Sequence, residues 1–322
     1  MKNTTSMLFA ALTLSFAGNA LGANYPNKTI ELVVPYAPGG TTDLVARIVA
    51  SELGEVLGEP VVVLNRPGAG GAVGSGYAAR QKPDGYTLVM AVESSHAVNP
   101  NVQAEPMYDP VKDFSPISNL VDVLGVLDVG VDSGFESFDD LLAELKDNPG
   151  QYTFGSSGTG GYSHLFGELF QSVTDTELLH VPYNGLGPAL VDLMAGQVNV
   201  VFDNLPSSMS ALNSGKAKPL AVAAEGRLES MPDIPTYAEL GYPELNNPSW
   251  FGLAAPAGTP DEILDILNVA LEEVLQDPKV VASIKEQGAL PAHTSRKEFQ
   301  KIIEESNERW AGLVKSIGFE KL

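Results

Sequence analysis

The stretch Val33-Val34-Pro35-Tyr36-Ala37-Pro38-Gly39-Gly40-Thr41-Thr42-Asp43 decides the fold of the first part of the chain. An apolar run typical of a strand ends at Val34, near the beginning of this stretch. After the stretch, apolar residues recur at helical spacing between Leu44 and Leu53. A strand, a glycine-rich turn and a helix aim backbone N–H groups beyond the end of the strand, because the first four amides of a helix have no partner within it. The helix dipole adds a partial positive charge there. The pattern predicts half of a site for a small carboxylate, although a turn and an ordinary N-cap explain it equally well.

The same unit recurs about 120 residues later, where a predicted strand over 152–154 enters Gly155-Ser156-Ser157-Gly158-Thr159-Gly160-Gly161 and a helix is expected over 163–173. If the two halves face each other, both sets of helix amides converge on one cleft. Neither loop contains Lys or Arg, so a carboxylate would rest on amides, hydroxyls and ordered water. Helix ends contribute about 0.3–1 kcal/mol each, up to ~2 when sheltered, whereas micromolar binding needs about 8 kcal/mol. Closure of the cleft and burial of the ligand must therefore supply the rest.

Residues 1–23 are expected to be a signal peptide, with Lys2 before an apolar segment that is too short to span a bilayer. Cleavage after residue 20, 22 or 23 fits equally well. The chain has no cysteine, which excludes disulfides, thiol catalysis and a lipid anchor on an N-terminal cysteine. We therefore expect an exported, unanchored protein of the periplasm.

The charge of the chain also restricts its partners. The full chain carries −21, and removal of residues 1–23, which hold one lysine and no acid, leaves −22. Such a chain is not expected to bind nucleic acid or anionic lipid through its overall field. An anionic ligand is still compatible with that charge, because salt screens distant carboxylates beyond a Debye length of about 8 Å.

The order of predicted elements indicates two α/β domains. Apolar strands alternate with helices over 30–92, which is typical of βαβ units in a parallel sheet with both faces covered. A second alternating block follows, and the C-terminal helices need the first sheet as a partner. We expect residues 24–124 and 249–322 to form domain 1 and residues 125–248 to form domain 2. Two chain crossings, near 121–126 and 247–252, would then act as a hinge.

Several finer features are predicted as well. Strands are expected over 121–131 and 250–254. A surface loop over 99–116 is expected to connect the alternating block at 30–92 to the strand over 121–131. Thr259-Pro260-Asp261-Glu262 predicts a helix with Thr259 as N-cap, and Ser295 with Glu298 predicts a capping box for a last helix over 296–317. Asp43 lies in the first turn of its helix, where an acid is expected for dipole reasons alone.

Enzyme motifs are mostly lacking. The sequence has no NTPase phosphate loop, and its four histidines show no metal-ligand spacing, so neither a metal nor another cofactor is expected. Gly74-Ser75-Gly76-Tyr77-Ala78-Ala79 fits a loose dinucleotide fingerprint, but it lies inside a predicted helix. A secreted serine hydrolase that uses Ser157 and His164 is the alternative from a different functional class.

The sequence resembles the Bug/TctC family of periplasmic receptors of tripartite tricarboxylate transporters in several motifs that run through the whole chain in order. They are Pro35–Asp43, Asn65–Gly71, Pro83–Leu88, His96–Pro100, Phe154–Gly158, His180–Gly185, Gly196–Val198, Phe202–Asn204 and Ala255–Pro260. The resemblance implies a Venus-flytrap fold that captures a carboxylate and delivers it to membrane permease subunits. Two departures concern the far end of the ligand: Asn184 stands where the family often has Lys, and Glu93 is an unexpected acid.

Together these observations predict a monomeric binding protein, with no enzymatic activity, for a dicarboxylate, an aromatic acid or an amino acid. The loops at 36–43 and 155–161 are expected to hold its carboxylate. A sensory receptor that presents its ligand to a histidine kinase is a further alternative with the same fold. The expected ligand-binding residues are Tyr36, Pro38, Gly39, Gly40, Thr41, Thr42, Ser94, Ser95, Ser156, Ser157, Gly158, Thr159, Gly160, Tyr183 and Asp203.

Overall fold

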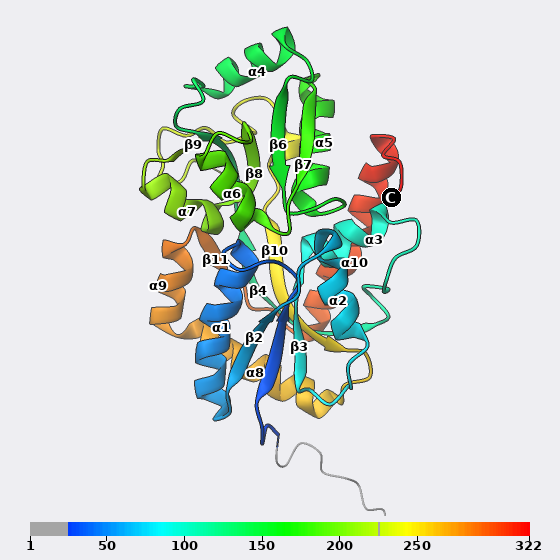
Figure 1. Ribbon diagram of the computed structural model, residues 1–322. Coiled ribbons are helices and arrows are strands. Elements are labelled where there is room, and N and C mark those ends of the chain that lie inside the picture. Colours follow the sequence, from blue (N-terminus) through cyan, green and yellow to red (C-terminus); the bar gives the residue numbers. More distant parts are fainter. Residues whose placement is uncertain (1–24, 225) are drawn as a thin grey trace, which may run out of the picture.

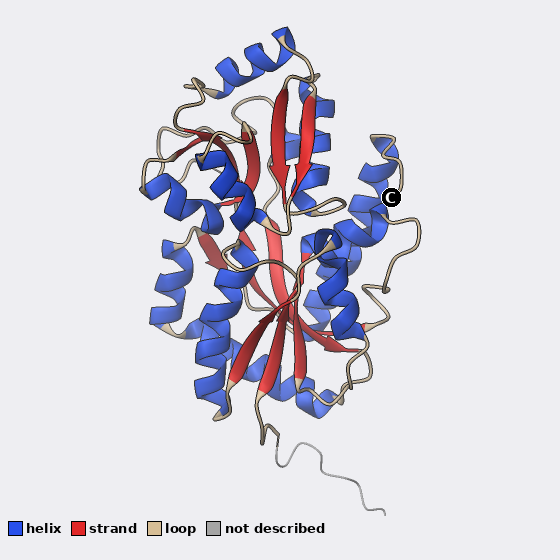
Figure 2. Ribbon diagram, in the orientation of Figure 1, coloured by secondary structure: helices blue, strands red, loops and turns tan. Residues whose placement is uncertain are grey.

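The computed structural model describes residues 25–224 and 226–322, so the expected signal peptide lies outside the described residues. The described chain forms two sheets, one in the lower and one in the upper part of the view in Figures 1 and 2, and helices lie on both faces of each sheet. None of the described helices combines the length and the apolar character needed to cross a membrane.

The first sheet has six strands. In spatial order they are β11 (Ala289–Pro291), β4 (Phe114–Val123), β10 (Ser249–Pro256), β3 (Thr87–Val92), β1 (Ile30–Val34) and β2 (Val61–Asn65). Helices α1 (Thr41–Leu57), α8 (Asp261–Gln276) and α9 (Pro278–Glu286) accompany one face. The other face carries α2 (Ala72–Ala79), the short helices η3 (Ser94–Val98) and α3 (Asn99–Val102), and α10 (Arg296–Ser316).

The second sheet has five strands. Their order is β7 (Leu178–Pro182), β6 (Tyr152–Ser156), β8 (Val200–Asn204), β5 (Gly125–Gly130) and β9 (Ala217–Ala223). Its helices are α4 (Phe138–Asp147), α5 (Tyr162–Thr174), α6 (Leu186–Met194) and α7 (Leu205–Asn213). Short 3-10 turns η2 (Ala69–Gly71) and η4 (Pro243–Leu245) complete the chain.

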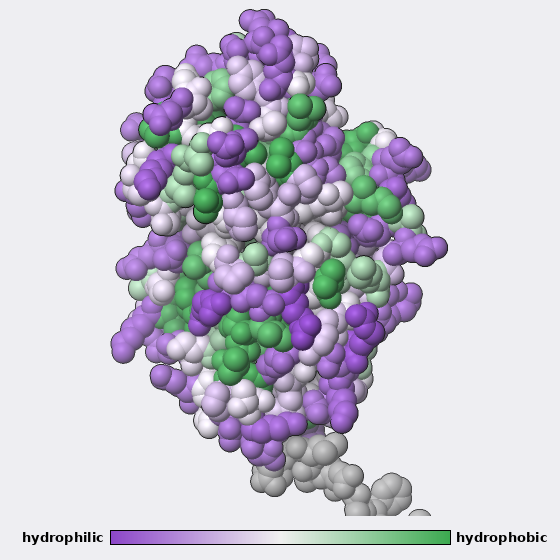
Figure 3. Space-filling view, in the orientation of Figure 1, coloured by the Kyte–Doolittle hydropathy of each residue, from purple (hydrophilic) through white to green (hydrophobic). Residues whose placement is uncertain are grey.

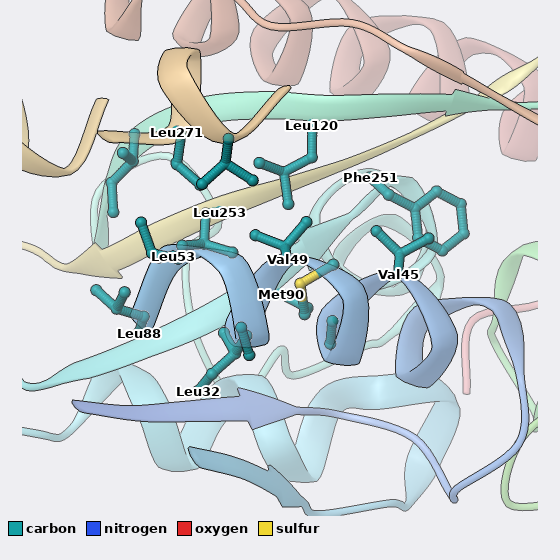
Figure 4. Packing of buried hydrophobic residues seen from close by; sticks show 14 of the residues in the cluster. Leu32, Val45, Val49, Leu53, Leu88, Met90, Leu120, Phe251, Leu253 and Leu271 are labelled. Carbon is teal, nitrogen blue, oxygen red and sulfur yellow. The ribbon is translucent and has the colours of Figure 1, made fainter. Parts of the chain in front are cut away.

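The strands have uninterrupted runs of apolar residues because helices cover both faces of each sheet. Along β1, Leu32 packs into the cluster under α1 and α8, whereas its neighbour Val33 packs into the cluster under α10. Figure 4 shows the first cluster, where Leu53 and Leu271 from the two helices meet the side chains of the sheet. Both are fully buried, and burial of such a side chain is worth about 1.5–3 kcal/mol.

The α/β fold predicted from the sequence is confirmed, with one difference in strand direction. β10 is antiparallel to β3 and β4, and β5 is antiparallel to β8 and β9, so neither sheet is purely parallel. These two strands are the ones that follow a crossing between the sheets, so each enters its sheet from the end opposite to its neighbours. The expected single strand over 121–131 is in fact two, because the chain leaves the first sheet after Val123 and enters the second at Gly125.

Other local predictions were wrong at element ends. The expected loop over 99–116 begins with α3 and ends in β4. α8 begins at Asp261 with Pro260 as its N-cap residue, because the Thr259 hydroxyl donates to the Pro256 carbonyl and does not cap the helix. The capping box of Ser295 and Glu298 is present as predicted.

Gly252 in the middle of β10 gives a test of how tightly the crossing strand packs. A Cβ atom there would lie 2.2 Å from Phe299 Cζ and 2.5 Å from the Ser118 carbonyl oxygen. We expect Gly252→Ala to lower the free energy of unfolding by about 1–3 kcal/mol, measured by urea titration. Gly312→Ala in α10, where a Cβ meets open space, should instead stabilise by about 0.5–1 kcal/mol. Equal unfolding midpoints for the two variants would contradict this account of β10.

Candidate functional site

The first wall of the candidate site is the start of α1. Its N-cap residue is Gly40, and no side chain caps the helix. Asp43 does not point at the site: its carboxylate accepts hydrogen bonds from Gly39 N–H at 3.0 Å, Asn65 Nδ2 at 2.9 Å and Arg47 Nε at 3.0 Å. Burial raises the pKa of Asp43, but these hydrogen bonds outweigh burial and lower it overall. Asp43 therefore anchors the loop before α1 and leaves the amides of the helix start to other partners.

The second wall is the start of α5, which has the same construction. Its N-cap residue is Gly161, again without a side-chain cap. Ser163 Oγ accepts from Ser157 N–H at 2.8 Å and donates to Ser157 Oγ at 3.1 Å. The loop is thus held by its own hydroxyls, with Ser157 and Ser163 at the surface of the site.

A small cavity lies between the two helix starts. Its volume is about 30 Å³, which gives room for about two water molecules. Its lining is rich in hydroxyls and contains no cationic side chain among the described residues. It consists of Tyr36, Gly40, Thr41, Thr42, Val92, Ser94, Ser157, Tyr162, Ser163, Leu186, Asn204, Ser249 and Phe251.

The half of the molecule built on the first sheet and the half built on the second sheet touch directly around this cavity. Tyr162 N–H donates to Ser94 Oγ at 2.8 Å, and Ala37 N–H donates to the Asn184 carbonyl at 2.9 Å. Thr41 Oγ1 donates to Ser207 Oγ at 3.0 Å and accepts from Ser207 N–H at 3.2 Å. In the space-filling view the two parts meet along a continuous surface without a wide opening on that face (Figure 3). The structure is therefore a closed form.

The structure brings six of the fifteen expected residues to the cavity wall: Tyr36, Gly40, Thr41, Thr42, Ser94 and Ser157. Pro38 and Gly39 lie on the exposed outer part of the first loop. Ser95 is fully buried and bonds the Val92 carbonyl and His96 Nδ1.

The second loop contributes its remaining residues to the contact between the halves. Gly158 has φ +129° and lies so close to Gly70 that a Cβ would be 3.0 Å from its nitrogen. The Thr159 carbonyl also faces Gly70, and the Gly160 carbonyl accepts from Asn99 Nδ2 at 3.4 Å. These glycines are needed for a close approach of two backbones.

Tyr183 and Asp203 lie behind the site. Tyr183 donates its hydroxyl to Asp192 at 2.7 Å. Asp203 is buried and accepts from Ser207 Oγ at 2.5 Å and from Ser208 Oγ at 2.8 Å. Ser208 also bonds Asp128, so two carboxyl groups share one hydroxyl. Asp203 also accepts from the Asn204 N–H at 2.6 Å, so it reaches the cavity indirectly, through Asn204 and through the contact of Ser207 with Thr41.

The geometry gives no support for the Ser157–His164 pair of a hydrolase. His164 Nδ1 accepts from Gly160 N–H at 3.1 Å, and its ring stacks on His180 at 3.8 Å. His180 Nε2 is 2.6 Å from Ser156 Oγ, but the Ser156 side chain is fully buried. Burial lowers the pKa of His164 to about 4, and burial together with His164 lowers that of His180 to about 3. These neutral rings hold the second loop in place through the hydrogen bonds to Gly160 and Ser156. Among the described residues no cluster of His, Asp or Glu has the arrangement of a metal site.

Glu93 does not face the cavity. It is fully buried and accepts from Trp310 Nε1 at 2.8 Å and from Arg309. The unexpected acid therefore joins the end of β3 to α10.

Sequence reasoning missed seven lining residues. Tyr162 and Ser163 form the first turn of α5 and could have been found by extending the second loop to the first helical turn. Asn204 adjoins Asp203 and Leu186 begins α6. Val92, Ser249 and Phe251 carry no signal in the sequence, because β3 and β10 meet only through the sheet: Phe251 pairs with Val92.

Comparison with known proteins agrees with this architecture. The sequence profile of the tripartite tricarboxylate transporter family receptor, TctC, matches residues 45–319. The chain belongs to this family. BugT of Bordetella pertussis is 38% identical over 307 residues, which cover 95% of this chain and 94% of the relative. The TctC family comprises periplasmic solute-binding receptors, so the resemblance noted in the sequence is confirmed.

Two solved structures extend this comparison. The periplasmic binding protein BugD is 34% identical with a TM-score of 0.89, and the alignment covers 92% of this chain and all of BugD. MatC of Rhodopseudomonas palustris, solved with bound malate, is 30% identical with a TM-score of 0.87, covering 90% of this chain and all of MatC. This TctC receptor thus shares its whole described fold with solute-binding proteins.

The buried carboxyl pair of this receptor predicts a pH effect on stability. Burial raises the pKa of Asp203 to about 6, and burial with the nearby Asp203 charge raises the pKa of Asp128 well above its usual value. The folded protein therefore holds protons that the unfolded chain releases above about pH 4. The stabilising contribution of the pair to the free energy of unfolding is complete below about pH 4 and is lost as the pH rises through about 6.

Asp128→Asn should flatten this loss, because only one acid remains. In urea titrations, the free energy of unfolding of the variant minus that of the wild type should increase as the pH rises from about 4 to about 8. The exposed Asp132→Asn is the control and should show the wild-type pH profile. Parallel profiles for all three proteins would contradict the shared, proton-holding pair.

Proposed function

We propose that this TctC receptor binds a small organic carboxylate in the cavity between the starts of α1 and α5. The observation that supports the proposal is the pair of opposed helix starts, each with a glycine N-cap and no side-chain cap, on one hydroxyl-rich cavity. A helix start is a favourable place for an anion because of its free amides and its dipole. MatC, with a similar fold and bound malate, supports the same ligand class.

Hydroxyl groups supply part of the binding energy in the absence of a lining cation. A hydrogen bond to a charged group contributes about 1.5–3 kcal/mol. Several hydroxyls converge here, among them those of Thr42, Ser94 and Ser157. Three such bonds, together with two helix ends, account for the roughly 8 kcal/mol of micromolar affinity.

The ligand enters an open form. A cavity of about 30 Å³ is too small for any multi-carbon acid, since it has room for about two waters. We propose that residues 24–124 and 249–322 move as one domain and residues 125–248 as the other. The hinge lies at Leu124 and at 246–248, where the chain passes between the sheets. Binding then shifts the equilibrium from the open form toward a form closed around the ligand, in which the two domains stand slightly further apart than in this structure.

We further propose the biological setting that the family suggests. The receptor works in the periplasm as a monomer after removal of the signal peptide, and membrane permease subunits of a tripartite transporter read its closed form. Presentation of the ligand to a sensor kinase is the alternative. The receptor performs no chemistry, because Ser157 has a serine partner where a hydrolase needs a histidine.

Ser157→Ala tests the site and the hydrolase alternative together. Loss of one hydroxyl bond to a carboxylate should weaken binding about 10- to 100-fold. The measurement is isothermal titration with the best ligand from a thermal-shift screen of mono-, di- and tricarboxylates, in which a ligand at 100 times its Kd stabilises by about 2.7 kcal/mol. Ser210→Ala on the exposed side of α7 is the matched control and should bind like wild type.

Two outcomes would count against the proposal. Unchanged affinity of the Ser157→Ala variant would remove the second loop from the site. Ester turnover by the wild type that disappears in this variant would favour the hydrolase.

A further inference from the structure

A second pocket lies beside the carboxylate cavity, between α5 and α10. Its volume is 170 Å³. Its walls are aromatic and aliphatic side chains from both halves of the molecule: Tyr162, Phe166 and Leu169 from α5, and Trp310 and Leu313 from α10. Apart from Tyr162, none of its lining residues belongs to the lining of the proposed carboxylate cavity.

Tyr162 is the wall common to the cavity and this pocket. Its N–H bonds Ser94 at the cavity. Its ring stacks on Phe166 with centroids 5.7 Å apart and meets Trp310 edge-on at 5.5 Å. Tyr162 therefore lies between the polar cavity and the aromatic pocket, and the pocket has both of its walls only when α5 lies against α10.

The two volumes suit two different parts of one ligand. The cavity of about 30 Å³ has room for two water-sized atoms, as a carboxylate group needs. An apolar cavity of about 150 Å³ binds benzene, so the pocket of 170 Å³ has room for an aromatic ring. We propose that this pocket is a subsite for the uncharged aromatic or bulky apolar tail of a monocarboxylate, with Tyr162 turning aside to join the two compartments. The inference rests on the proposed carboxylate site.

The charges around the pocket argue against a second carboxylate there. Arg309 is the cation at its edge, but its guanidinium is already paired with the buried Glu93. Glu244 and Asn247 complete the polar edge, so a second anion would meet a carboxylate and no free cation. A ring, by contrast, gains burial against Tyr162, Phe166 and Trp310 and loses no hydration of charge.

The position of the pocket links the tail to closure. A ring held there touches α5 and α10, which belong to the two halves that we propose to move. Burial of its apolar surface occurs only in the closed form, so the tail would favour closure as well as affinity. A short acid would lack this contribution.

Paired acids of equal chain length test the inference by isothermal titration. The pairs are phenylacetate with acetate, 3-phenylpropionate with propionate, and 4-phenylbutyrate with butyrate, and succinate represents short diacids. We expect the best ring-bearing acid to bind about tenfold or more tighter than its partner and than succinate. Leu313→Trp fills the pocket and should weaken that acid about tenfold while short acids stay within about threefold.

Control variants keep the test independent of folding. Val269→Trp places the same side chain on the exposed face of α8 and should leave every affinity unchanged. Leu313→Phe is the milder filling variant if the tryptophan variant does not fold, as judged by its thermal midpoint. If short acids bind and the ring gives no advantage in the wild type, or if Leu313→Trp weakens all acids equally, the subsite is overturned while the carboxylate site stands. If no carboxylate binds at all, the proposed function itself fails.

Discussion

Two helices that begin without side-chain caps are the constraint on which the site depends. α1 and α5 start at Gly40 and Gly161, where a Ser, Thr, Asp or Asn would ordinarily satisfy one of the free amides. A buried N–H group without an acceptor costs about 1–3 kcal/mol. The surrounding structure presents these helix starts to one cavity, because β1 and β6 both end at the contact between the halves. Ser94 Oγ already accepts from the first amide of α5, at Tyr162, so an acceptor brought by a ligand would satisfy amides of the two helix starts that have no such partner.

The acids near the site are arranged so that their charge does not oppose an anion. The mature chain carries −22 after loss of residues 1–23. Asp43 is paired with Arg47 and accepts a hydrogen bond from Asn65, and Glu93 points into α10. Asp203, which holds a proton more readily because burial raises its pKa to about 6, is not part of the cavity lining and is held behind it by Ser207 and Asn204. A strongly acidic protein can therefore present a neutral, hydroxyl-lined cavity to a carboxylate.

Local patterns predicted the parts of the site that depend on neighbouring residues. The units β1–α1 and β6–α5 follow from apolar runs and glycine turns, which place Thr41 at the start of α1 and Ser157 directly after β6. Phe251 and Ser249 could not be predicted, because β10 reaches the site only by crossing back into the first sheet beside β3. Tyr183 and Asp203 were expected at the rim from their place after strands, but hydroxyl and carboxyl partners draw both away from the cavity. Strand ends can be read from sequence, whereas the direction of each side chain depends on partners that are distant along the chain.

The contacts between the halves explain why a ligand can control closure. The hydrogen bonds from Tyr162 to Ser94, from Ala37 to Asn184 and between Thr41 and Ser207 join neutral groups. Each such bond contributes about 0.5–1.5 kcal/mol net, because water replaces it in an open form. A few neutral bonds give a total of only a few kcal/mol. An ion pair across the cleft would hold the halves together with or without a ligand. Since these hydrogen bonds are weak and uncharged, the hydrogen bonds that a carboxylate makes with both helix starts are of the size that shifts the populations of the two forms.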